Sequence, residues 1–143
     1  MKIFDQSFKI NLKNHKDKRG FFIEIFKLSQ LNFKSKINQI SHSFIKKNVI
    51  KGWHFHKKQT QWNYLLKGKI KVFLIDNRKH SKTFNKIKSF QINADKEKVV
   101  YFFPANIGHA YITYSKDNHM IYGTSGYYDK NEEYKSSFNR DLI

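Results

Sequence analysis

Hydrophobic residues recur at every second position over much of this chain. Ile70, Val72 and Leu74 are spaced in this way, Ile87 and Ser89 flank Lys88, and 99–103 is a short run of apolar residues. Successive side chains of an extended strand point to opposite faces, so a period of two is typical of strands that bury one face. Most of the molecule is therefore expected to be β-strand.

Turn-forming residues separate these runs at short intervals. They fall at 67–69, 76–78, 93–95 and 115–118. Such spacing suits an antiparallel barrel or sandwich. Helix is expected only at 28–33 and 131–138, where Asn131 can cap the second segment and Glu132 and Glu133 suit its first turn. The chain has no repeat, low-complexity segment or linker, so a single all-β domain is predicted over its whole length of 143 residues.

The composition is that of a folded protein in spite of its charge. Aromatic residues make up 17% and hydrophobic residues 39%, which is too much core-forming material for a disordered chain. There is no cysteine, which excludes disulfides, thiolate metal sites and cysteine nucleophiles and is compatible with a cytoplasmic location. No stretch approaches the roughly 20 apolar residues that a membrane-spanning helix needs, so no membrane partner is expected.

The net charge is strongly positive. Lysine and arginine number 28 against 11 acidic residues, which gives +17. Such an excess attracts anions, and nucleic acid is one class of partner to consider. The arginines, however, are confined to Arg19, Arg78 and Arg140, and no nucleic-acid recognition module is present. Two explanations remain: a biased composition without selection for binding, or an anionic substrate such as a nucleotide diphosphate. No nucleic-acid partner is predicted.

Three histidines are the strongest candidates for chemistry. His54 and His56 flank Phe55, so on a strand their imidazoles point the same way and can line one cavity. His109 follows Pro104 in a turn more than fifty residues later, and it reaches that cavity only if the intervening strands fold back. This requirement favours a barrel. The remaining histidines lack such a spacing and are expected at the surface: His15, His42, His80 and His119.

The spacing of these residues resembles the two motifs of the cupin superfamily, which are small double-stranded β-helix (jelly-roll) barrels. The matching positions are Gly52, His54, His56, Gln61, Gly68, Pro104 and His109. Metal-dependent cupins carry glutamate where this chain has Gln61. Because a neutral amide is a weaker ligand than a carboxylate for a divalent cation, tight metal binding is disfavoured. A metal-binding or non-catalytic sugar-binding cupin remains an alternative.

Several segments resemble the dTDP-4-dehydrorhamnose 3,5-epimerase family more closely. Residues 19–26 are similar to its Arg-Gly-Phe-Phe-x-Glu-x-Phe segment, 51–55 to its Arg-Gly-Leu-His-Phe, 81–84 to its Ser-Pro-Thr-Phe, and 103–111 to its proline and histidine turn. The resemblance implies a metal-free cupin that needs no cofactor and acts on a nucleotide-linked 4-keto-6-deoxysugar. Its chemistry is proton transfer beside the ketone, which inverts C3, C5 or both.

The resemblance also implies residue roles. His54 matches the catalytic base, Tyr122 the tyrosine that returns a proton, and His109 a residue near the keto oxygen. A base with a pKa near neutrality suits this proton abstraction, and a phenol on the other face of the ring suits inversion. The residues expected to contact the substrate are Arg19, Glu24, Gln39, Lys51, His56, Gln61 and Tyr128. A homodimer is expected in which Arg19 acts across the interface, because the resembled enzymes exchange N-terminal strands.

Three departures from the epimerase pattern keep a second reaction open. The epimerases have a lysine at the position of Gln61, and here Lys57 or Lys58 is the nearest substitute. The base of the epimerases is oriented by an aspartate that matches no position before the end of this chain, and Asp141 is the nearest aspartate. His56 replaces a glutamine. Residues 54–58 also resemble the His-x-His-Lys-Lys segment of the dTDP-sugar 3,4-ketoisomerases, which end soon after a Tyr-Tyr-Asp segment like 127–129. Tyr122 favours the epimerase, because an acid in place decides inversion.

Overall fold

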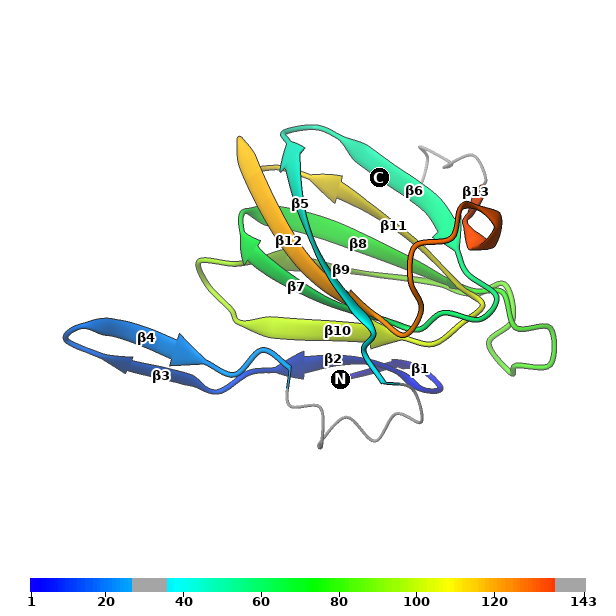
Figure 1. The fold of residues 1–143 in the computed structure, drawn as a ribbon, viewed down its shortest axis with the longest axis horizontal. Coiled ribbons are helices and arrows are strands. Elements are labelled where there is room, and N and C mark those ends of the chain that lie inside the picture. Colours follow the sequence, from blue (N-terminus) through cyan, green and yellow to red (C-terminus); the bar gives the residue numbers. More distant parts are fainter. Residues whose placement is uncertain (27–35, 136–143) are drawn as a thin grey trace.

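The chain folds into two antiparallel sheets and a hairpin (Figure 1). The computed structural model describes residues 1–26 and 36–135. The six-stranded sheet has the order β1 (Lys2–Phe4), β2 (Ser7–Asn11), β10 (Val99–Phe103), β7 (Gln61–Lys67), β12 (Asp117–Thr124) and β5 (Gln39–Lys46). The five-stranded sheet has the order β13 (Tyr134–Lys135), β6 (Ile50–Phe55), β11 (Ile107–Thr113), β8 (Lys69–Asp76) and β9 (Ile87–Asn93). The hairpin joins β3 (Asn14–Asp17) to β4 (Gly20–Ile23).

The inner faces of the two sheets pack against each other. Ile70, Val72 and Leu74 of β8 are almost completely buried, which confirms the prediction from their alternation. They belong to one hydrophobic cluster with residues of the other sheet, among them Tyr101 and Met120. Each large apolar side chain buried in this way contributes about 1.5 to 3 kcal/mol by leaving water. This cluster holds the sheets together as the jelly-roll barrel that the sequence predicts.

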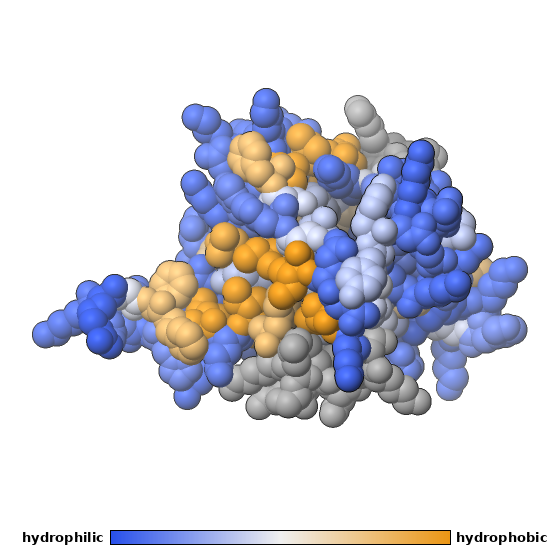
Figure 2. All heavy atoms as spheres, viewed as in Figure 1, coloured by the Kyte–Doolittle hydropathy of each residue, from blue (hydrophilic) through white to orange (hydrophobic). Residues whose placement is uncertain are grey.

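The outer face of the six-stranded sheet is also hydrophobic. Trp62 of β7 lies opposite Phe102 of β10, with ring centroids 5.2 Å apart, and a cluster of buried residues forms around them. Figure 2 shows a hydrophobic surface on this side of the molecule, close to the base of the β3–β4 hairpin. Exposed residues of this sheet include Ile40 at 65% and Phe44 at 54%. A large exposed apolar surface of this kind is a feature of faces that contact another molecule.

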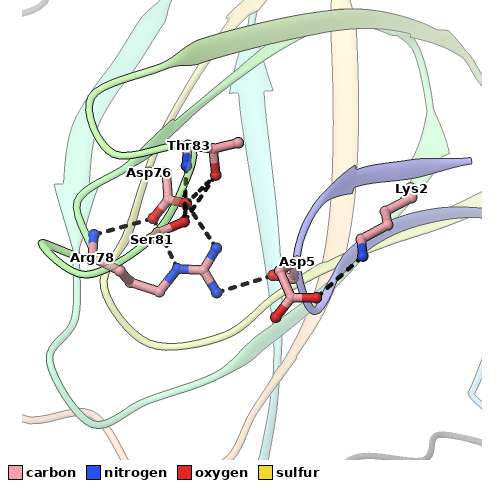
Figure 3. Close-up of polar contacts among 6 residues, drawn as sticks. All are labelled: Lys2, Asp5, Asp76, Arg78, Ser81 and Thr83. Carbon is pink, nitrogen blue, oxygen red and sulfur yellow. Dashed lines mark hydrogen bonds and ion pairs between the residues drawn. The ribbon is translucent and has the colours of Figure 1, made fainter.

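The loop after β8 is organised around one buried carboxylate (Figure 3). Asp76 accepts hydrogen bonds from Arg78 Nε and Nη2, both at 2.8 Å, from Ser81 Oγ at 2.7 Å and from Thr83 Oγ1 at 2.6 Å. Arg78 Nη1 donates to the main-chain oxygen of Asp5 at 3.0 Å. Burial alone would raise the pKa of Asp76, but these hydrogen bonds hold it far below its usual value. The network ties this loop to the N-terminal turn.

One predicted element is wrong and another lies outside the described residues. Over 131–135, the described part of the helix predicted at 131–138, the structure has a 3-10 turn, η1 (Lys130–Glu132), which Asp129 caps, followed by β13. Pairing of β13 with β6 is a long-range interaction that overrides the local helix signal. The helix predicted at 28–33 falls in the segment that is not described. Among the described residues, no helix is long and apolar enough to cross a membrane.

Candidate active site

A cavity of about 210 Å³ opens between the two sheets. One wall carries the three imidazoles that the sequence singled out: His54 and His109 lie on the five-stranded sheet, and His56 directly follows β6. The six-stranded sheet lines the opposite wall with Tyr122 and several neutral polar side chains. Strands remote in sequence thus converge here as the histidine spacing requires.

The imidazole wall depends on a close approach of β6 and β11. His54 and His109 are partners in the register of these strands, and their ring centroids lie 6.0 Å apart. His109 also stacks on His56 at 5.9 Å and on Phe103 at 4.7 Å. Gly52 makes the approach possible, because its φ of +154° is rarely adopted by other residues and a Cβ there would collide with Ala110.

Two imidazoles are anchored through their Nδ1 atoms by one segment. His54 Nδ1 lies 2.8 Å from Glu133 Oε1, and His56 Nδ1 lies 2.9 Å from the main-chain oxygen of Glu132. A carboxylate and a carbonyl oxygen only accept hydrogen bonds, so in the neutral rings Nδ1 carries the proton. The lone pair of each ring is then on Nε2.

The surroundings shift the acidities of these groups. Burial, together with His56 and His54, lowers the pKa of His109 to about 3, against a smaller contribution from the main chain of Ile107. Burial also lowers the pKa of His56, although the Glu132 carbonyl opposes this. Burial acts to raise the pKa of Glu133, but its hydrogen bond to His54 and the neighbouring charges lower it overall. At neutral pH, His109 is therefore a neutral hydrogen-bonding group and Glu133 an anion.

The opposite wall is neutral. Tyr122 lies on β12 directly across from Asn63 of β7. Gln61 Nε2 donates to Asn63 Oδ1 at 2.6 Å, and Asn63 Nδ2 to the main-chain oxygen of Tyr101 at 3.4 Å. Burial, with a contribution from Tyr122, raises the pKa of Tyr111 to about 12, so this phenol stays protonated. This wall offers hydroxyl and amide groups of the kind that recognise sugars.

Positive charge is scarce in the cavity. Among its lining residues in the described chain, Lys51 is the only lysine or arginine. Lys57 does not substitute for a lysine at position 61, because its Nζ lies 4.3 Å from the ring centroid of Tyr134. Lys58 does not line the cavity either, within the described residues. An oxyanion formed here would be stabilised mainly by neutral donors such as His109 and Gln61.

Most of the residues predicted from sequence meet in this cavity. They are His54, Tyr122, His109, Gln39, Lys51, His56, Gln61 and Tyr128. Arg19 and Glu24 are exposed and, in the described part of the chain, are not among the lining residues. The side chain of Arg19 is 89% exposed at the turn of the β3–β4 hairpin, where it pairs with Asp17.

The sequence interpretation missed the orienting carboxylate. It looked toward Asp141, which lies outside the described residues, and assigned Glu132 and Glu133 to the first turn of a helix. The available signal was a pair of carboxylates three and four residues after the Tyr-Tyr-Asp segment at 127–129. Asn63 and Tyr111 were also missed, because as strand residues they give no motif of their own.

The histidines raise the question of a metal ion. Within residues 1–26 and 36–135, no group of three or more histidine, cysteine, aspartate or glutamate side chains is placed to hold one.

A double-sheet barrel with an imidazole-lined cavity between its sheets defines a cupin. Comparison with known proteins then gives the family: the chain belongs to the dTDP-4-dehydrorhamnose 3,5-epimerase family, whose model matches residues 3–142. Membership makes it an isomerase, an epimerase of nucleotide-linked sugars. The cupin fold and the family inferred from the sequence motifs are both confirmed.

Individual relatives support this placement. The chain is 28% identical over 136 residues to the dTDP-4-dehydrorhamnose 3,5-epimerase of Salmonella typhimurium (strain LT2), covering 89% of this chain and 73% of that protein. It is 31% identical over 100 residues to the spore coat polysaccharide biosynthesis protein SpsL of Bacillus subtilis (strain 168), covering 70% and 65% respectively. The crystal structure of dTDP-4-dehydrorhamnose 3,5-epimerase from Bacillus anthracis str. Ames superimposes with a TM-score of 0.90 at 23% identity, covering 99% of this chain and 85% of that one.

Proposed function

We propose that this chain binds a dTDP-linked 4-keto-6-deoxysugar and inverts C3, C5 or both, with His54 as the base and Tyr122 as the acid. The observation that carries the proposal is their placement: the two side chains line one cavity from opposing sheets. A sugar ring held between the sheets presents one face to the imidazole and the other to the phenol. Inversion of a carbon requires removal of a proton from one face and its return on the other.

The chemistry follows from the neighbours of the reacting atoms. His54 Nε2 takes the proton from the carbon beside the ketone, and the electron pair of that C–H bond moves to the ketone oxygen as an enolate. His109 and Gln61 donate hydrogen bonds that stabilise this oxygen. Tyr122 then gives its phenolic proton to the opposite face, and the electron pair returns to carbon. The imidazolium loses its proton to water and the phenolate regains one, so the cycle is balanced without a cofactor.

The nucleotide part of the substrate rests on the relatives and on charge. The Bacillus anthracis structure was solved with TDP and PPi bound. In this chain Lys51 lies at the cavity and can pair with a diphosphate, and the +17 net charge attracts such an anion. A small-molecule nucleotide sugar is the proposed partner rather than nucleic acid or a membrane.

The test is proton exchange in deuterated water with dTDP-4-keto-6-deoxyglucose, followed by NMR of the sugar ring. Deuterium at C3, C5 or both, with the inverted product, is the expected result. An unchanged spectrum at high enzyme concentration contradicts the proposal for this substrate. Because base and acid are separate residues here, exchange without inversion would point to a base without an acid on the opposite face.

One observation favours 3,4-ketoisomerisation as a second candidate. His56 presents an Nε2 lone pair from the same wall as His54, because its Nδ1 donates to the Glu132 carbonyl. Two bases on one face could take the proton from C3 and return one to C4, while O4 gains a proton and O3 loses one through an enediol. The same NMR experiment separates the two functions, since the ketoisomerase would give a 3-keto product.

We propose that the active form is a homodimer in which the β3–β4 hairpin delivers Arg19 to the cavity of a second copy. Figure 1 shows this hairpin projecting from the barrel. It exposes Phe21 at 61% and Phe22 at 64%, and the six-stranded sheet exposes Ile40 and Phe44. Covering these side chains would stabilise an association. The measurement is complementation: a mixture of Arg19→Ala and His54→Asn chains should regain activity that neither has alone, and a mixture that stays inactive contradicts the shared site.

We also propose that the chain is one cupin domain and acts in the cytoplasm. The lack of cysteine is compatible with a reducing compartment. A single cooperative unfolding transition and recovery with a cytoplasmic marker on cell fractionation are the expected results. Two separate transitions, or recovery with the membrane fraction, would contradict them.

A further inference from the structure

The segment that follows β12 is fixed against the strand that carries the histidines. In the pairing of β13 with β6, Tyr134 lies opposite Phe55 and Lys135 opposite His54. The rings of Phe55 and Tyr134 stack with centroids 5.0 Å apart. This register brings the residue before β13, Glu133, beside the His54 ring. The contact is therefore built by strand pairing and ring stacking as well as by charge.

The same segment holds both histidines, but through groups of different charge. Glu133 offers a carboxylate to His54, whereas Glu132 offers a neutral main-chain carbonyl to His56. Both acceptors select the same tautomer, so both rings present Nε2 to the cavity. The rings differ in what happens when a proton arrives. A facing carboxylate stabilises an imidazolium strongly, and a carbonyl dipole does so far less.

From this asymmetry we infer that Glu133 is the positioning residue that makes His54, rather than His56, the base of the reaction. This inference rests on the proposed function. Glu133 acts through the His54 ring: it fixes the ring and faces the positive charge that forms when Nε2 takes the proton. His56 remains a neutral ring that hydrogen-bonds the substrate. The pocket is then a one-base site, which favours inversion over ketoisomerisation.

The remaining charges near the pair agree with this assignment. Lys135 Nζ lies 3.5 Å from the second carboxylate oxygen of Glu133 and helps to keep it ionised. Burial disfavours the charged form of His56, whose pKa is lowered. Within the described chain, the other titratable residues that line the cavity with His54, His56 and Glu133 are Lys51, Tyr101, His109, Tyr111, Tyr122, Tyr128 and Asp129.

The test compares Glu133→Gln with Glu97→Gln. Glu97 is a matched control, because it also forms a 2.8 Å ion pair, with Lys9, away from the cavity. Glu133→Gln keeps a hydrogen-bond acceptor but removes the charge, so kcat should fall about 100-fold with KM within about two-fold, the size of a general-base contribution. The acid limb of its pH profile should move to lower pH, because an amide stabilises the protonated ring less. Glu97→Gln should stay within about two-fold of the parent.

The choice between the two rings is tested by exchange. His54→Gln should abolish deuterium incorporation at the inverted carbon. His56→Gln should raise KM, because it loses a hydrogen bond to the substrate, but should still incorporate deuterium at saturating substrate. A Glu133→Gln enzyme with the kcat and pH profile of the parent overturns the inference. So does loss of exchange in His56→Gln combined with its retention in His54→Gln.

A measurement without substrate keeps the inference separate from the proposed function. If the unmodified chain shows no exchange with the sugar, the proposed function fails but the positioning role is still open to test. Nitrogen-15 NMR of the histidine rings should show His54 protonated at Nδ1 in the parent chain. In Glu133→Ala the proton should shift toward Nε2, the form favoured by free imidazole side chains. A tautomer of His54 that is unchanged in Glu133→Ala overturns the positioning role whatever the substrate is.

Discussion

Two carboxylates in this molecule hold a nitrogen partner at the same distance in very different surroundings. Asp76 Oδ2 lies 2.8 Å from Arg78 Nη2, and Glu133 Oε1 lies 2.8 Å from His54 Nδ1. The side chain of Asp76 is completely buried and accepts hydrogen bonds from Arg78, Ser81 and Thr83. The side chain of Glu133 is 22% exposed. Arg78 Nη1 also donates to the main-chain oxygen of Asp5, whereas the Nε2 atom of His54 is left for the cavity. A network with every group satisfied stabilises the fold, and one that leaves a lone pair open can do chemistry.

The largest expected effect is on the Glu133–His54 pair, which leaves the Nε2 lone pair open to the cavity. His54→Asn should lower turnover by about 10³ to 10⁴-fold, because it removes the general base, while the midpoint of urea unfolding changes little. Steady-state assays and urea titrations measure the two quantities. His80→Asn is the control, since His80 is exposed in the loop after β8. Turnover close to that of the parent in His54→Asn would show that the base is elsewhere.

The Asp76–Arg78 network should show the reverse: its loss should lower stability and leave turnover unchanged. Asp76→Asn leaves Arg78 without its charge partner in a largely buried site, so the free energy of unfolding should fall by about 3 kcal/mol. Activity per folded molecule should stay near that of the parent, because Asp76 does not line the cavity within the described chain. Asp117→Asn is the matched control at an exposed pair with Lys67, where a loss of about 0.5 kcal/mol or less is expected. Equal losses in the two variants would contradict the contrast.

Tyr122 lies on the opposite wall of the cavity, which in the described chain carries no charged side chain from the six-stranded sheet. Tyr122→Phe removes the acid but leaves His54 and its carboxylate in place, so inverted product should fall about 100-fold while deuterium exchange continues. NMR of the sugar ring in deuterated water follows both events at once. Tyr111→Phe removes a phenol from the same cavity and should affect inversion less. Simultaneous loss of exchange in Tyr122→Phe would mean that the phenol supports the base as well.

Features that depend on local spacing could be predicted from the sequence, whereas contacts made by long-range strand pairing could not. The alternation through β8 depends on local spacing, so it predicted burial correctly, and the His-x-His spacing predicted two rings on one face. The Glu133 contact depends on a two-residue strand, β13, pairing with a strand some eighty residues earlier. No local pattern specifies such a pairing, and the local signal at 131–138 favoured a helix instead. Arg19 was placed at the substrate by motif, and its hairpin carries it away from the cavity of its own chain.

The smallest expected effect is on the pH dependence of the free energy of unfolding, which should differ between the cavity histidines and the Asp76 network. The pKa of His109 falls from an ordinary 6.5 to about 3 on folding, so between these values the unfolded chain binds a proton that the folded chain does not. Stability therefore falls as the pH falls from 7 toward 3, and His56 acts in the same direction. The pKa of Asp76 is lowered from 3.8, so its contribution is complete above that value and is lost only below it.

Urea unfolding at pH 7, 6 and 5 should thus show that the free energy of unfolding falls by roughly 1 to 2 kcal/mol between pH 7 and pH 5, because of His109 and His56. His109→Gln should reduce this loss by about half or more, because a glutamine cannot bind the proton in the unfolded chain. Asp76→Asn should leave the slope in this range unchanged and flatten it only below about pH 4. If His109→Gln keeps the slope of the parent, the acid sensitivity originates outside the cavity. If Asp76→Asn removes the slope between pH 7 and 5, the loop network and the imidazole wall are not energetically independent.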